Sequence, residues 1–242
     1  MKLHICKDVN DLSMQAAVWI GAVIKQTLAV QDRFTIALSG GSTPQKLHNL
    51  LSGYPYREEI DWTKLHIFWG DERAVPMDDE RNNAKMAFDT LLDKVAIPME
   101  QIHVMRTDIE PERAAEEYEK VLQKYFSDKG FSFDLVLLGM GDDGHTLSLF
   151  PGTPVIHETE RWATSFYLPA QHMHRITLTA SIVNRAARVA FLTTGSGKSQ
   201  ALKQVLEGPF DPDKYPSQVI KPIGELHWFV DKEAAALLTS VH

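Results

Sequence analysis

The segment after the apolar run at residues 133–138 combines side chains that can do acid–base chemistry. It reads Gly139-Met-Gly-Asp-Asp-Gly-His145. A histidine titrates near neutral pH, so His145 could take a proton from water and return it to a leaving group. A carboxylate two residues away, on Asp143, could orient the imidazole and stabilise its protonated form. We therefore expect His145 and Asp143 to be catalytic.

Glycines and small hydroxyl residues at Ser39–Pro44 are typical of an anion site. The stretch follows the strand predicted at 33–38, and Pro44 suits the first turn of a helix. Glycine lets the backbone approach a ligand closely. Free N–H groups at a helix start favour negative charge, although a plain turn with a hydroxyl cap is the alternative. The expected anion-binding residues are Gly40, Gly41, Ser42 and Thr43.

Three positively charged residues could meet such an anion. Arg73 closes the motif Asp71-Glu-Arg73, directly after the strand predicted at 64–69, and arginine can bind an anion through two N–H groups. Lys198 stands beside two glycines at a predicted helix start, and Arg175 stands at the head of another strand. Asp71 could act on a sugar hydroxyl or pair with Arg73. Structural or simply exposed roles stay open for Lys198 and Arg175.

Two glycine patterns resemble nucleotide sites but fail on spacing or charge. A P-loop requires a glycine at the position that Leu192 occupies, inside a predicted strand. Residues 139–144 match G-x-G-x-x-G, yet Asp142 and Asp143 would repel a pyrophosphate. Pro151 also ends the next segment too early for a dinucleotide helix. We therefore expect no nucleotide cofactor.

The other histidines and the cysteine favour structural roles. His172 and His174 could be two metal ligands, but no third is evident, so we expect no metal. A lone cysteine cannot form an internal disulfide, and Cys6 is expected to be a small buried side chain in a strand. Three further histidines lie within predicted strands, where packing is the simplest role: His66, His103 and His227.

Apolar runs of strand and helix type alternate along the chain. Strands are predicted at 33–38, 64–69, 102–105, 133–138, 162–168, 176–179, 189–193 and 226–230. Helices are predicted at 11–30, with Asn10 or Asp11 as cap, and at 45–51, 83–95, 111–129, 181–187, 199–207 and 232–238. The strands are apolar on both sides, which indicates an α/β fold: a three-layer, Rossmann-like, mostly parallel sheet with helices on both faces.

This architecture would bring the polar motifs together, because parallel strands point their carboxyl ends the same way and ligands bind beyond those ends. We predict one domain over residues 1–242. No Gly/Ser-rich or charge-rich linker interrupts the chain, and residues 208–222, with four prolines, are expected to form a surface loop.

Composition narrows the function classes. With 25 Lys and Arg against 32 Asp and Glu, the formal charge is −7, which argues against a nucleic-acid partner. The most apolar long segment, residues 14–30, is too polar and too short to span a bilayer. The N-terminal segment does not match a signal peptide. We expect a cytoplasmic protein without a membrane partner, either a monomer or a small homo-oligomer.

Taken in order, the motifs resemble those of 6-phosphogluconolactonases over nearly the whole chain. They are Leu38-Ser-Gly-Gly-Ser-Thr-Pro44, Asp71-Glu-Arg-Ala-Val-Pro76, Gly139-Met-Gly-Asp-Asp-Gly-His-Thr-Leu-Ser-Leu-Phe-Pro151, Arg175-Ile-Thr-Leu-Thr179 and Gly195-Ser-Gly-Lys198. The resemblance implies cofactor-free hydrolysis of 6-phospho-D-glucono-1,5-lactone to 6-phosphogluconate, in the oxidative pentose phosphate pathway. It also implies a phosphosugar lactone as the ligand, with Arg73 and Lys198 on its phosphate, His145 as general base and Asp143 as its helper.

The sequence departs from the family pattern at three places, none of which removes an expected catalytic group. Asp142 is often Pro or Glu, Leu147 is usually Ala, and Asn82-Asn83 stands where Ser-Asn is common. Two other functions stay open. One is a glucosamine-6-phosphate deaminase or isomerase, whose carboxylate base could be Asp71. The other is a non-enzymatic phosphosugar sensor, although the chain has no residues left for a DNA-binding region.

Overall fold

Six parallel strands form the central sheet of the protein, described here over residues 1–239 from a computed structural model. Their order across the sheet is β1-β9-β8-β5-β2-β3, so the first and last strands pair with each other. The strands are β1 (Lys2–Cys6), β2 (Phe34–Leu38), β3 (Leu65–Trp69), β5 (Leu135–Leu138), β8 (Arg188–Thr193) and β9 (Glu225–Asp231). The prediction of a mostly parallel sheet is confirmed.

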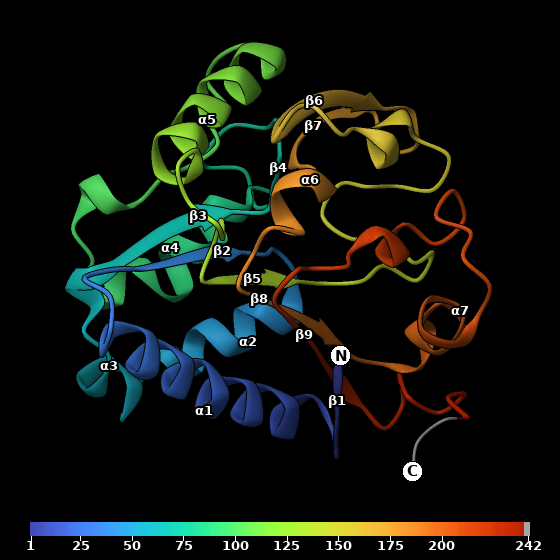
Figure 1. Ribbon diagram of the computed structural model, residues 1–242, viewed down its shortest axis with the longest axis horizontal. Coiled ribbons are helices and arrows are strands. Elements are labelled where there is room, and N and C mark those ends of the chain that lie inside the picture. Colours follow the sequence, from blue (N-terminus) through green and yellow to red (C-terminus); the bar gives the residue numbers. More distant parts are fainter. Residues whose placement is uncertain (240–242) are drawn as a thin grey trace.

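Helices cover both faces of this sheet (Figure 1). Below it in the view lie α1 (Val9–Leu28) and α2 (Ser42–Leu51), and α4 (Asn83–Thr90) adds buried alanines to the same cluster of side chains. The opposite cluster receives side chains from α5 (Pro111–Phe126), α6 (Ala180–Val183) and α7 (Ser199–Glu207). A single turn, α3 (Tyr56–Glu59), follows α2. No helix within residues 1–239 has the length and apolar character needed to cross a membrane.

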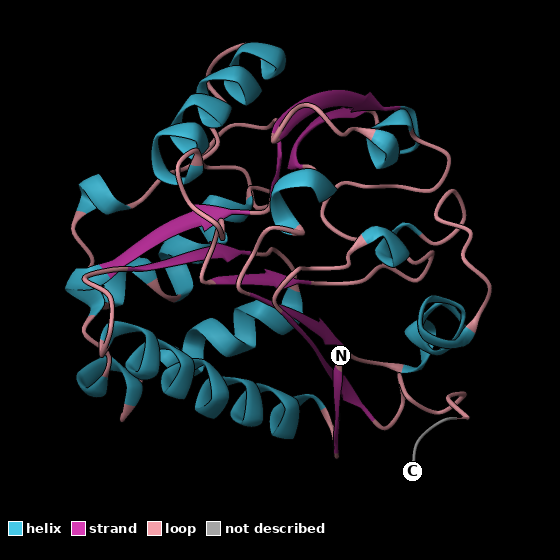
Figure 2. Ribbon diagram, viewed as in Figure 1, coloured by secondary structure: helices cyan, strands magenta, loops and turns pink. Residues whose placement is uncertain are grey.

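A small antiparallel sheet stands apart from the main one (Figure 2). It has the order β4-β7-β6, from β4 (Asp71–Arg73), β7 (Met173–Leu178) and β6 (Ala163–Leu168). The sequence predicts β6 and β7 but treats the Asp71-Glu-Arg73 motif as the end of a strand. Its three polar residues instead form a strand because β7 supplies their partners, with Arg73 opposite Arg175.

Several predicted elements are wrong or shorter than expected. Residues 102–105 form no strand, since only Ile102 makes a bridge, to Ile67 at the sheet edge. The helix predicted at 232–238 does not form, since residues 232–237 form turns. The helices predicted at 83–95 and 181–187 end at Thr90 and Val183. In the three segments predicted as helices, the apolar side chains do pack in the core, although no continuous helix forms.

The cap of α1 also differs from the prediction. The side chain of Asp8 accepts hydrogen bonds from the backbone N–H groups of Asn10 and Asp11, at 2.9 and 3.0 Å, so the helix begins at Val9. Asn10 and Asp11, which the sequence suggests as caps, therefore lie inside the first turn. An aspartate before the first helical residue satisfies N–H groups that no helical carbonyl can reach.

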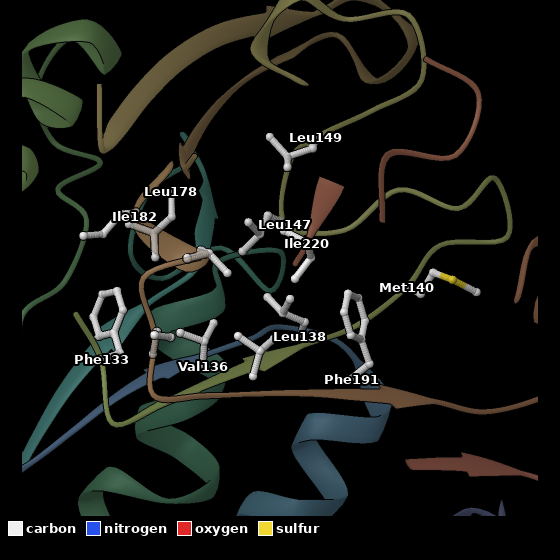
Figure 3. Close-up of a cluster of buried hydrophobic side chains, with 14 of the residues drawn as sticks. Phe133, Val136, Leu138, Met140, Leu147, Leu149, Leu178, Ile182, Phe191 and Ile220 are labelled. Carbon is white, nitrogen blue, oxygen red and sulfur yellow. The ribbon is translucent and has the colours of Figure 1, made fainter. Parts of the chain in front are cut away.

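Two clusters of buried apolar side chains sandwich the sheet. All five residues of β2 and all four of β5 are buried, as expected for strands covered on both faces. Figure 3 shows the cluster on the α5 side, where Val136 and Leu138 of β5 lie beside Phe191 of β8 and Ile220 from the segment before β9. This core fixes the carboxyl ends of the strands, from which the polar motifs emerge.

Candidate functional site

A polar cavity of about 230 Å³ lies at the carboxyl ends of the central strands. The sequence-predicted site residues that line it are Gly40, Asp71, Arg73, His145, Arg175 and Lys198. They come from segments spread over the chain, after β2 and β5, within β4 and β7, and before α7. The expectation that the motifs converge is therefore met for these six residues. Residues added by the structure include Ser39, Asn83, Phe150 and Gln171.

The other four predicted residues do not line this cavity. Gly41 and Ser42 line an adjoining cavity of about 330 Å³ that shares Arg73 with the first. Gly41 precedes α2 with φ of 104°, and this glycine provides no side-chain cap for the first N–H groups of that helix. Those groups are therefore available to an anion. Thr43 borders neither cavity, and its hydroxyl forms a 2.9 Å hydrogen bond with Thr194.

His145 and Asp143, the two residues expected to be catalytic, are in direct hydrogen-bond contact. Nδ1 of the imidazole lies 2.6 Å from Oδ1 of Asp143, which also accepts from the backbone N–H of His145 at 3.0 Å. Burial acts to raise the pKa of Asp143, but these hydrogen bonds prevail and hold it below its ordinary value. An ionised Asp143 favours the tautomer with the proton on Nδ1, which leaves Nε2 as the basic nitrogen.

The loop that carries this pair is held by its own short hydrogen bonds. The N–H of Gly141 donates to the carbonyl of His145 at 2.8 Å, and Thr146 Oγ1 donates to the carbonyl of Gly139 at 2.8 Å. The imidazole stacks on Phe150, with ring centroids 4.2 Å apart. A Cβ on Gly141 would lie 2.1 Å from Nδ1 of His145, so glycine is required there for the ring to take its place.

Two arginines present donors that the protein leaves unused. Nε of Arg73 and Nε of Arg175 are buried without a hydrogen-bond partner in residues 1–239. Arg73 is fixed through Nη1, which donates to the carbonyl of Arg81 at 2.8 Å. Arg175 is only 3% exposed, and burial lowers its pKa against the opposing effect of Asp71. Unpaired buried donors are costly, which favours an anionic ligand beside both side chains.

Lys198 faces the cavity but already has a carboxylate partner. Its ammonium group pairs with Oδ1 of Asp142, one of the residues that depart from the family pattern. Lys198 is about one-quarter exposed, whereas Asp142 is largely exposed. The carboxylate oxygens of Asp142 also lie near Gly197, at the start of the turn before α7. An anion that reaches Lys198 must therefore compete with Asp142.

Asp71 is fixed within the site rather than paired with Arg73. Ser148 Oγ donates to its Oδ2 at 2.6 Å, and Nη1 of Arg175 lies 3.8 Å from the same oxygen. The backbone carbonyl of Asp71 accepts from Nδ2 of Asn83 at 2.9 Å. Sequence reasoning missed these contacts because Ser148 lies 77 residues away along the chain.

Glu72, to which the sequence gives no role, anchors the start of α4. Its carboxylate accepts from the backbone N–H groups of Asn83, Ala84 and Arg73 at 2.7 to 2.8 Å. Burial raises the pKa of Glu72 to about 7, against the opposite effect of these bonds. The anchor places Asn83 against Gly40, where a Cβ would come within 1.9 Å of the amide oxygen. The sequence signal for this role is the acidic residue at the centre of the motif Asp71-Glu-Arg73.

The arrangement can bind a small anion and move a proton beside it. A basic imidazole nitrogen and three cations border one cavity, a combination suited to proton transfer on a negatively charged substrate. Residues 1–239 contain no group of three or more His, Cys, Asp or Glu side chains placed to hold a metal ion.

Comparison with known proteins places the chain among characterised sequences. The family model for glucosamine-6-phosphate isomerases/6-phosphogluconolactonase matches residues 7–228. A 6-phosphogluconolactonase of Synechocystis sp. is 42% identical, with 91% of each chain covered. One of Nostoc sp. is 43% identical over 86% of each chain.

A solved structure extends the likeness to the fold. The 6-phosphogluconolactonase from Trypanosoma cruzi superimposes with a TM-score of 0.84 at 29% identity, covering 98% of this chain and 97% of that one. Sequence and fold thus lead to the same group of proteins. The chain belongs to the glucosamine-6-phosphate isomerase/6-phosphogluconolactonase family.

Proposed function

We propose that the protein hydrolyses 6-phospho-D-glucono-1,5-lactone to 6-phospho-D-gluconate. The observation that carries this proposal is the His145–Asp143 pair, whose imidazole borders the same cavity as Arg73, Arg175 and Lys198. The lactone has an electrophilic carbonyl at one end and a phosphate at the other, and the cavity offers a base for the first and cations for the second. The curated relatives in the comparison carry the same activity in their names.

In the proposed mechanism, Nε2 of His145 takes a proton from a water molecule as the water oxygen attacks C1. Asp143 accepts the Nδ1 hydrogen bond and stabilises the imidazolium that forms. The tetrahedral intermediate then collapses, the bond from C1 to the ring oxygen breaks, and the imidazolium protonates that oxygen. A lactone is activated already, so the scheme uses water as the nucleophile and no covalent intermediate.

In this proposal the cations and the N–H groups at the start of α2 bind the phosphate. Arg73 borders both cavities, so it is placed to contact a ligand that extends from the imidazole towards Gly41 and Ser42 at the start of α2. Lys198 supplies the second cation once Asp142 is displaced. Two fixed donors and a helix N-terminus bind a dianion more strongly than a neutral sugar, which gives selectivity for the phosphorylated lactone.

The test is the rate of lactone hydrolysis by the purified protein, after subtraction of spontaneous hydrolysis. Loss of a general base costs on the order of 10²- to 10⁴-fold, so His145→Ala should lower kcat by that factor. His174→Gln, which changes an exposed histidine of β7, serves as the control and should keep the wild-type rate. A His145→Ala protein with near-wild-type kcat would contradict the assigned base.

A second assay distinguishes lactone hydrolysis from the other activity that the family description contains. Deamination of glucosamine 6-phosphate would need a free carboxylate base, for which Asp71 is the candidate. Oδ2 of Asp71 instead already accepts from Ser148 and lies 3.8 Å from Nη1 of Arg175, so this oxygen is not free. Ammonia release from glucosamine 6-phosphate, without lactone hydrolysis, would overturn the proposal. So would binding of phosphosugars with no turnover at all, as expected of a sensor.

The wider setting of the protein is proposed with the activity. We place it in the cytoplasm as one domain, without a nucleic-acid or membrane partner, and as a monomer or small homo-oligomer. Packing of both apolar clusters on one sheet supports the single domain. The proposed compartment is tested by fractionation, since some relatives are named as chloroplastic.

A further inference from the structure

The segment between α7 and β9 is more than a surface loop. Three consecutive residues of its short turn, Pro216, Ser217 and Gln218, are buried, and Ile220 is only 2% exposed. Figure 3 shows Ile220 within the same apolar cluster as Leu147, which closely follows His145 in the chain. The segment is therefore packed beneath the loop that carries the proposed catalytic pair.

Ser217 contacts that loop directly. Its backbone N–H and its hydroxyl both donate to the carbonyl oxygen of Gly144, at 2.9 and 2.8 Å. Gly144 lies between Asp143 and His145 and has φ of 78°, in the region that favours glycine. The two hydrogen bonds therefore fix the peptide that leads into His145.

Tyr215 packs closely against Gly144, the residue whose carbonyl Ser217 contacts. A Cβ on Gly144 would lie 3.0 Å from Cδ1 of Tyr215 and 3.3 Å from its Cα. The positive φ and this close approach both require glycine at position 144. The loop and the segment thus fit against each other at one backbone position, and the hydroxyl of Ser217 is the side-chain donor at that position.

The segment is itself held firmly enough to act as a support. The side-chain amide of Gln218 donates to the carbonyls of Gln204 and Pro209, both at 2.9 Å, and its oxygen accepts from the N–H of Asp211 at 2.7 Å. Asn184, after α6, donates to the carbonyl of Val219 at 2.8 Å. These contacts tie the segment to α7 and α6, which pack on the sheet.

We propose that Ser217 is a positioning residue for the catalytic pair. Its hydroxyl holds the Gly144 peptide, and through it the imidazole of His145, in the orientation that Asp143 and the substrate require. This inference rests on the proposed function for the role of His145. Because Ser217 touches the loop and borders neither cavity described above, its loss should act on kcat rather than on KM.

The test compares Ser217→Ala with Ser132→Ala. Ser132 is also buried, and its hydroxyl also donates to a backbone carbonyl, that of Ile182, at 2.8 Å. Both variants lose one buried hydrogen bond, so similar falls in Tm are expected. Only Ser217→Ala should lower kcat, by about 10-fold, with KM within 2-fold of wild type. Ser217→Cys, which keeps a weak donor, should give an intermediate kcat and replaces the alanine variant should that fail to fold.

A second measurement does not depend on turnover. The ¹⁵N chemical shifts of the His145 imidazole report its hydrogen bond to Asp143, and they should change in Ser217→Ala but not in Ser132→Ala. Unchanged kcat and unchanged shifts in Ser217→Ala would overturn the inference. Absence of lactone hydrolysis by the wild-type protein would instead contradict the proposed function, and the shifts would still decide the role of Ser217.

Discussion

At the residue scale, the sequence predicts the contact between His145 and Asp143 but not the groups that hold this pair. His145 and Asp143 are two residues apart, so their contact follows from local geometry. The bond from Ser217 to Gly144 spans 73 residues, and no local spacing predicts it. Arg175 is likewise buried because of its place in β7, opposite Arg73 of β4. The polar composition of β4 does not indicate a strand.

The ion pair between Asp142 and Lys198 leads to a prediction about substrate affinity. In the proposed mode of binding, a substrate phosphate displaces the carboxylate from the ammonium group, so Asp142→Asn should lower KM. The pair is exposed on the Asp142 side and therefore screened by water, which limits the expected effect to about 2- to 5-fold, with kcat little changed. Initial rates at two ionic strengths measure it, and the difference should shrink at high salt.

Asp61→Asn is the control for net charge. Asp61 lies 3.8 Å from Lys64 just before β3, at the opposite end of the strands from the cavity. The Asp61→Asn substitution removes the same unit of negative charge and leaves the surroundings of Lys198 unchanged. A KM that is unchanged in Asp142→Asn, or that falls equally in both variants, would count against competition at Lys198.

At the element scale, the helices and buried strands follow from their apolar spacing, whereas β4 does not. Three polar residues carry no strand pattern, and their pairing depends on β7, about 100 positions later in the chain. The prediction of short elements at the edge of the fold fails for the opposite reason, because the composition indicates a strand that lacks a partner. Residues 102–105 have the composition of a strand, but only Ile102 reaches a partner.

The end of β9 supports the loop that carries Lys198, and this gives an element-scale prediction. Both carboxylate oxygens of Asp231 accept from the N–H of Gly195 at 3.0 Å, and Oδ1 also accepts from Ala234 at 2.8 Å. Asp231→Ala leaves buried donors unpaired, which should cost about 1–3 kcal/mol of the free energy of unfolding. Because Lys198 follows in the same loop, KM should rise more than kcat falls.

Denaturant unfolding and steady-state kinetics together check this expectation. Asp134→Ala is the matched control, since Asp134 accepts from the N–H and hydroxyl of Thr35, both at 2.8 Å, at the amino end of β5. That variant should lose stability while it keeps its KM. If Asp231→Ala changed stability alone, β9 would have no part in placing Lys198.

At the scale of the whole molecule, the sequence predicts the layered fold well because burial of a parallel sheet imposes a strong apolar pattern. All nine residues of β2 and β5 are buried and apolar or small, which only a sheet covered on both faces requires. The separate antiparallel sheet is less predictable. Its strands β6 and β7 have ordinary strand composition, which does not indicate the sheet to which they belong.

Global stability should fall in mild acid because of a buried neutral histidine. His48 of α2 is fully buried, and burial lowers its pKa to about 4. The unfolded chain has the ordinary value of about 6.5, so the unfolded state binds the proton first as pH falls. The contribution of His48 is therefore complete above pH 6.5 and is lost between about pH 6.5 and 4, on the order of 2–3 kcal/mol.

His48→Leu should flatten this pH dependence. Thr90, which lies 3.2 Å from Nδ1 of His48, also donates to the carbonyl of Met86 and so keeps a partner in the variant. Tm measured from pH 7.5 to 4.5 should fall less in His48→Leu than in wild type, and His174→Gln should behave as wild type. Glu72, with its raised pKa, acts in the opposite direction as pH rises towards 7, and it is common to all three proteins. Parallel curves for all three would show that His48 does not carry the effect.

The pairing of β1 with β9 has a consequence for how the chain is made. Lys2 and Glu225, which form an ion pair across these strands, are 223 residues apart. At a synthesis rate of roughly 5–20 residues per second, β1 leaves the ribosome about 10 to 45 s before its partner exists. Strands β2, β3, β5 and β8 can assemble in the meantime, because none of them pairs with β1. Strand β1 is thus among the last of the described strands to find its partner in the sheet.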